Sequence, residues 1–166
     1  EVVGAVRENR SFILGTFSGR SVEPIAKTVE MMRNSPSTHV QADAERAFPS
    51  LKGYPDLRYC RGCAGFSGFA KGQDYRERIY DFSEQMRTRL GSRWKEWGSE
   101  QVTSNFILAN TEGAMVLPYP AFSDFQPRKN ISGLSFLHFI GTHRWAEGGY
   151  ARAARQQIRL LAKGAA

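Results

Sequence analysis

The chain has 166 residues, of which 41% are hydrophobic and 23% charged, so it fits one globular domain with a buried core. It has no apolar run near the roughly 20 residues that a membrane-spanning helix needs, and no signal-peptide pattern. We therefore expect a cytoplasmic protein. The net charge of +7 favours anionic partners. The basic residues are dispersed and form no nucleic-acid motif, so nucleic acid is not the favoured partner.

Hydrophobic periodicity predicts alternating helices and strands, and hence an α/β fold. Helices are expected over residues 2–8, 24–33, 41–48, 74–90, 100–110 and 150–163, the fifth of them capped by Ser99. Strands are expected over residues 11–17, 58–70, 114–118 and 134–140, and loops over residues 49–55 and 119–130. With no internal repeat, residues 1–166 are expected to form one domain or a fragment of one.

The strand expected over residues 58–70 is rich in glycine. Gly62, Gly65 and Gly68 alternate with small and aromatic residues. Glycines in a strand indicate that a ligand or another strand approaches the backbone closely. A glycine-rich bulge without functional weight is the alternative.

The same stretch holds the two cysteines, Cys60 and Cys63, in Cys-Arg-Gly-Cys. Two cysteines do not make a disulfide framework, which favours a reducing compartment. With His138 and His143 they offer four ligands of the kinds that zinc takes. The 74 residues between Cys63 and His138 are far more than a zinc finger has, so buried structural thiols are favoured over zinc or redox chemistry.

Residues 134–145 contain one histidine in a short apolar run. His138 interrupts the run, Gly141 ends it, and Arg144 and Trp145 follow. Ligands of α/β sheets bind at strand ends. A histidine there, followed by a glycine and an arginine, suits a metal-bound phosphate group. The alternative is a core strand with a hydrogen-bonded histidine.

The helix expected over residues 150–163 is amphipathic and basic. It carries Ile158 and Leu161 on one side and Arg152, Arg155 and Arg159 on another. Such a helix is usually docked on the protein surface. Peripheral contact with an anionic membrane is the less common use.

Four short motifs follow one another in the second and third parts of the chain. Cys-Ala-Gly-Phe (63–66) is followed by Glu-Gln-Val-Thr-Ser-Asn (100–105), Leu-Pro (117–118) and His-Phe-Ile-Gly-Thr-His-Arg-Trp (138–145). Together they resemble the C-terminal half of family-eight glycosyltransferases, the glycogenin and lipopolysaccharide galactosyltransferase group with the GT-A fold. The resemblance covers about residues 58–146. It implies the C-terminal part of a GT-A-like mixed sheet flanked by helices.

The chain departs from the family pattern at several positions. Cys63 replaces asparagine, Val102 replaces a second aspartate, Glu100 replaces aspartate and Arg144 replaces lysine. The family also carries Asp-x-Asp in its nucleotide-binding half. That motif does not occur here, and Asp43 stands alone in Ala-Asp-Ala. We therefore expect that the chain lacks the donor half, or that the fold is used without catalysis.

The resemblance implies nine site residues. They are His138 for the metal, Gly141 and Arg144 for the diphosphate, Glu100 and Gln101 for catalysis, and Ala64, Gly65, Asn105 and Trp145 for the sugar or acceptor. It implies a UDP-sugar donor, Mn²⁺ or Mg²⁺ as cofactor, transfer with retention of configuration, and an acceptor that is a glycan or another molecule. The cation and Arg144 would neutralise charge on the departing diphosphate. The alternatives are a basic module that binds nucleic acid or another anion, and a zinc-stabilised module without catalysis.

Overall fold

The computed structural model describes residues 1–15, 17–54, 56–125, 134–162 and 164. The α-helices are α1 (Val2–Arg7), α2 (Ile25–Arg33), α3 (Val40–Ala47), α4 (Arg76–Leu90), α5 (Ser99–Ala109) and α6 (Gly149–Ala162). The strands are β1 (Phe12–Leu14), β2 (Glu23–Pro24), β3 (Arg58–Tyr59), β4 (Cys63–Gly68), β5 (Met115–Leu117), β6 (Phe122–Asp124) and β7 (Phe136–His138). Short 3-10 segments occupy η1 (Phe48–Ser50), η2 (Gly91–Lys95) and η3 (Gly141–Gly148).

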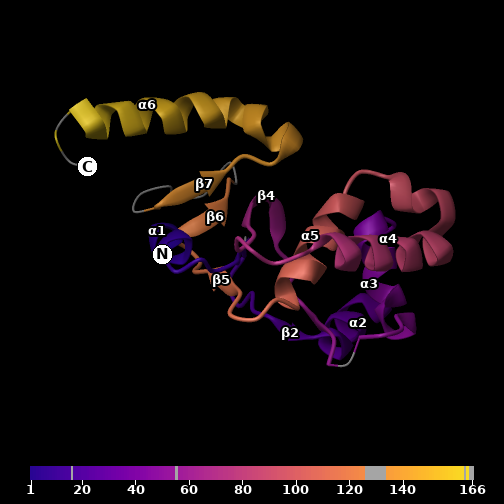
Figure 1. Cartoon of the computed structure of the whole chain (residues 1–166). Helices are drawn as coiled ribbons and strands as arrows, with labels where there is room; N and C mark the ends of the chain where they lie inside the picture. Colours follow the sequence, from indigo (N-terminus) through magenta and orange to yellow (C-terminus); the bar gives the residue numbers. More distant parts are fainter. Residues whose placement is uncertain (16, 55, 126–133, 163, 165–166) are drawn as a thin grey trace.

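The expected α/β fold is confirmed, with a mixed sheet in the order β4–β1–β5 (Figure 1). The central strand β1 pairs in parallel with β5 and antiparallel with β4. All three of its residues are buried, as expected for an apolar strand covered on both faces. Helices α2 to α5 gather on one side of the sheet, and the parallel β6–β7 pair with α6 lies on the other (Figure 1).

Strand β4 bulges where it passes β1. The pairing jumps from Leu14–Cys63 to Ile13–Ser67, so residues 64–66 have no partner on β1. The bulge turns these residues toward β7, where the ring of Phe66 stacks on Phe136 at 4.1 Å between centroids. A bulge that redirects side chains is common beside functional sites.

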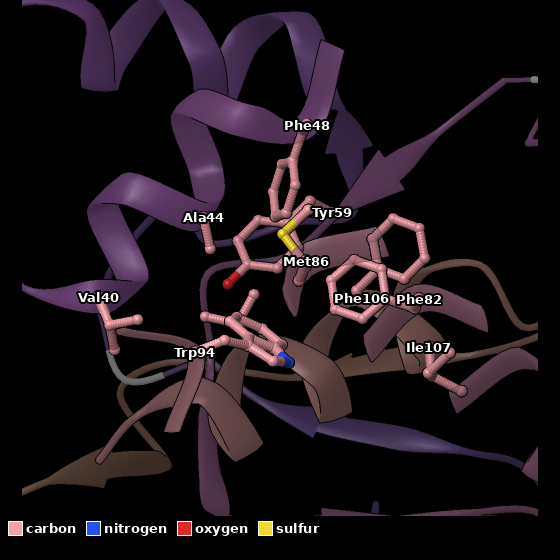
Figure 2. Close-up of a cluster of buried hydrophobic side chains, with 10 residues drawn as sticks. Val40, Ala44, Phe48, Tyr59, Phe82, Met86, Trp94, Phe106 and Ile107 are labelled. Carbon is pink, nitrogen blue, oxygen red and sulfur yellow. The ribbon is translucent and has the colours of Figure 1, made fainter. Parts of the chain in front are cut away.

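The largest core cluster lies between helices α3, α4 and α5 (Figure 2). Its buried members are Val40, Ala44, Phe48, Tyr59, Phe82, Met86, Trp94, Val102, Phe106 and Ile107. Phe82 and Phe106 stack with ring centroids 4.1 Å apart and planes at 15°. The predicted apolar faces of these helices therefore meet one another and fix the start of α5.

Three local expectations were wrong. Residues 119–130 were expected to be loop, but β6 forms at 122–124 because β7 supplies a parallel partner; residues 126–130 lie outside the described part. Helix α5 begins at Ser99 itself, and its cap is Gly98, whose N–H donates to Glu100 Oε2 at 2.9 Å. The strand expected over 58–70 is two strands, β3 and β4.

Helix α6 confirms the helix expected over 150–163 as far as Ala162. Among the described residues, no helix combines the length and the apolar character that a membrane crossing requires.

Candidate functional site

A cavity of about 630 Å³ opens between the β4 bulge, the start of α5 and the end of β7. Its lining is rich in cationic, aromatic and backbone-exposing residues. These are Phe17, Arg20, Gln41, Arg61, Gly62, Cys63, Ala64, Gly65, Trp97, Glu100, Gln101, His138, Phe139, Ile140, Gly141 and Arg144. Five segments that are far apart in the chain therefore meet in one cavity.

Seven of the nine predicted site residues line this cavity. They are Ala64, Gly65, Glu100, Gln101, His138, Gly141 and Arg144. Asn105 is instead fully buried, and its Nδ2 donates to the carbonyl of Gly62 at 2.8 Å. Trp145 is 72% exposed and is not among the cavity-lining residues. Asn105 thus holds the backbone of Gly62, just before strand β4, by a hydrogen bond.

The imidazole of His138 packs directly against the backbone of Gly65. A methyl group on Gly65 would lie 2.3 Å from Cε1 and 2.5 Å from Nε2 of the ring, well inside van der Waals contact. Burial lowers the pKa of His138; the nearby Asp124 opposes this shift and Arg144 adds to it. Lowering the pKa from its usual 6.5 leaves the imidazole neutral at pH 7. His138 therefore offers a lone pair or a single N–H to a ligand.

Three arginines give the cavity a positive lining, namely Arg20, Arg61 and Arg144. The Nε of Arg20 is buried and has no hydrogen-bond partner among the described residues. Arg144 uses its Nε to donate to the carbonyl of Gly141 at 3.0 Å. Its terminal nitrogens have no partner among the described residues, so they can bind a ligand. Planar guanidinium groups suit phosphate oxygens.

A hydrogen-bond chain runs from the cavity into the core. Gln101 Nε2 donates to Gln41 Oε1 at 3.1 Å, and Gln41 Nε2 donates to Glu45 Oε1 at 3.1 Å. The same carboxylate oxygen lies 3.2 Å from Nε of Arg61. Glu45 is fully buried. It thus orients two groups of the cavity wall, Arg61 directly and Gln101 through Gln41.

Gln41, Glu45, Arg20 and Arg61 were not predicted as site residues. A signal for two of them existed, because Gln41 and Glu45 are one helical turn apart and border the buried Val40 and Ala44. A polar pair at the core side of a helix is normally retained only when it has partners. The sequence could not show that those partners come from α5 and from the residue before the bulge.

The buried carboxylate makes stability depend on pH. Burial raises the pKa of Glu45 above its usual 4.5, although Arg61 opposes the shift. The stabilisation linked to this group is therefore full below pH 4.5 and is lost as the pH rises through the raised pKa. The quantity to compare is the difference in free energy of unfolding between wild type and Glu45→Gln. We expect this difference, wild type minus variant, to decrease as the pH rises from 4.5 to neutrality. Urea unfolding at both pH values checks this; a constant or rising difference would contradict it.

The described residues do not complete a metal site. No three His, Cys, Asp or Glu side chains among them form a group that could hold an ion. Asp43, the aspartate of Ala-Asp-Ala, is occupied by Arg46 and Arg93 and is not among the cavity-lining residues. Mn²⁺ or Mg²⁺ at His138 would need oxygen ligands beyond those described.

The two thiols are placed for packing. Cys60 lies in one hydrophobic cluster with Ile13, and Cys63 lies in another with Leu117. Burial raises the pKa of Cys60 to about 12 and also raises the pKa of Cys63. Zinc binds thiolates, which these surroundings disfavour. The side chain of His143, the fourth ligand of the zinc alternative, lies outside the described part.

Comparison of the chain with protein-family models, with curated proteins and with solved structures finds no match. A function must therefore be inferred from the residues that line the cavity and from their chemistry.

Proposed function

We propose that the cavity binds a nucleotide-diphospho-sugar, with a UDP-sugar as the first candidate. We further propose that the chain is part of a GT-A glycosyltransferase of the family-eight type, which transfers the sugar to an acceptor hydroxyl. One observation carries this proposal: three of the motifs that resemble that family supply seven predicted residues to a single cavity.

The proposed reaction breaks the bond between the anomeric carbon and a phosphate oxygen and forms a bond to the acceptor oxygen. Negative charge grows on the departing diphosphate, and guanidinium groups placed in advance stabilise it. Arg20, Arg61 and Arg144 are the cations of the lining. Among the described residues that line the cavity, Glu100 is the one carboxylate. It would take the proton of the acceptor hydroxyl as that oxygen forms its new bond.

The remaining proposed contacts to the substrate come from glycine backbone and from Gln101. Gly141 presents backbone to the cavity, and backbone that lacks a side chain lets phosphate or sugar approach closely. Gly65 instead leaves room for the imidazole of His138. Gln101, held by Gln41, would hydrogen-bond the sugar on the face shared with Glu100, which suits the retention that the resemblance implies. We assign no step to a metal, because the described donor set does not complete a site.

Calorimetry with UDP, with and without Mn²⁺, tests the binding. Arg144→Gln is expected to weaken UDP binding about 10- to 150-fold, since a charge-assisted hydrogen bond contributes about 1.5–3 kcal/mol. Arg33→Gln, which removes an exposed arginine at the end of α2, is the control and should bind as wild type. Folded protein that gives no heat with UDP in either condition would refute the nucleotide-sugar proposal.

The positive lining also suits a module that binds an anion without catalysis. UDP-sugar binding without transfer or hydrolysis, and without loss on Glu100→Gln, would favour that alternative.

A further inference from the structure

The first half of helix α6 is anchored to the protein, whereas its second half exposes apolar side chains. Gly149 lies against the ring of Phe125, leaving no room for a side chain. Tyr150 contacts Phe139 edge-on at 5.1 Å between centroids, and Ala153 is buried. The helix begins on the β6–β7 pair and continues beyond it (Figure 1).

Among the described side chains of the second half, two large apolar ones are exposed. Ile158 is 64% exposed and Leu161 is 63% exposed. They lie one turn apart, beyond the anchored first half of the helix.

A basic stripe runs beside the apolar one. Arg152, Arg155 and Arg159 recur at three- and four-residue steps, and all three are exposed. No acidic residue occurs from residue 148 to residue 166. The exposed surface of α6 therefore combines apolar side chains with positive charges and carries no negative side chain.

We propose that this face of α6 docks on the surface of an anionic membrane, with the helix lying in the plane of the interface. Ile158 and Leu161 enter the apolar boundary, while Arg155 and Arg159 reach the lipid phosphates along their aliphatic stems. Charge complementarity selects this occupant. A second copy would bring another net charge of +7, which would repel the first. A nucleic acid would leave the isoleucine and the leucine without an apolar contact.

Cosedimentation of the whole chain with vesicles tests the proposal. Wild type should bind phosphatidylcholine vesicles that contain phosphatidylglycerol, more weakly at high salt, and should not bind phosphatidylcholine alone. Arg155→Gln with Arg159→Gln should weaken partition about thirtyfold. Ile158→Gln with Leu161→Gln should weaken it at least about tenfold. Glutamine keeps the helix propensity, and circular dichroism checks the fold.

Arg76→Gln with Arg87→Gln is the matched control. It removes the same charge from exposed positions on α4 and should leave vesicle binding close to wild type. Equal losses in the control and in Arg155→Gln/Arg159→Gln would overturn the proposal, because net charge alone would then explain binding. Failure of wild type to bind anionic vesicles would overturn it as well. So would a dimer that Ile158→Gln/Leu161→Gln dissociates, because the occupant would then be a second copy.

Discussion

Gly65→Ala is expected to reduce the proposed sugar transfer about 100-fold, the order of loss that a displacement of about 1 Å can cause at a reacting centre. The new methyl group would lie 2.3 Å from Cε1 of His138, so the imidazole must move. The ring is the far end of a side chain, and moving it takes less than moving strand β4. Folding is therefore expected to survive while the cavity wall is rebuilt.

The position of His138 can be measured apart from any activity. Burial lowers the pKa of His138 in wild type. When the alanine pushes the ring toward solvent, the pKa should rise toward its usual value of 6.5. Nuclear magnetic resonance titration of the imidazole reports this shift. Gly4→Ala is the control, because a methyl group there meets nothing within 4 Å. An unchanged His138 titration in Gly65→Ala would refute the packing argument.

Phe106→Ala is expected to lower the free energy of unfolding by about 3–5 kcal/mol, the range for a buried phenylalanine replaced by alanine. Phe106 is fully buried, and its ring contacts those of Phe82, Tyr54 and Phe48. Its removal leaves a cavity in the cluster that holds α3, α4 and α5 together (Figure 2). Urea denaturation measures the loss.

Phe69→Ala provides the comparison for this core substitution. Phe69 is 42% exposed and makes one edge-on contact with Tyr75. Its loss should cost about 1 kcal/mol, the middle of the range for one aromatic pair. Losses of similar size in the two variants would show that Phe106 does not anchor the core.

The local structure followed from local patterns. The apolar steps at Ile79, Phe82, Met86 and Leu90 predicted helix α4, and its buried residues are Phe82 and Met86. Periodicity works here because one helical face must leave water whichever element it meets. Boundaries were less exact, as at Ser99, because a cap depends on backbone geometry and on which side chain reaches it.

Most of the candidate site could also be proposed from the sequence. The four motifs lie in one order, and their neighbours in the chain are strand ends and a helix start, which α/β folds bring together. Two of the predicted residues are not among those that line the cavity. Asn105 lies on the inner side of α5, where a buried amide supports Gly62. Trp145 lies in η3, outside the cavity.

The sequence by itself therefore determined the α/β class, the apolar faces of the helices and the residue types that the proposed phosphate-binding cavity needs. These depend on periodicity and on side-chain chemistry. Only the tertiary structure decided that Gln41 and Glu45 support Gln101 and Arg61, and that the bulge of β4 brings Gly65 against His138. Except for the Gln41–Glu45 bond within α3, these contacts join residues 16 to 73 positions apart. Their geometry is set by how whole elements pack, which no local pattern records.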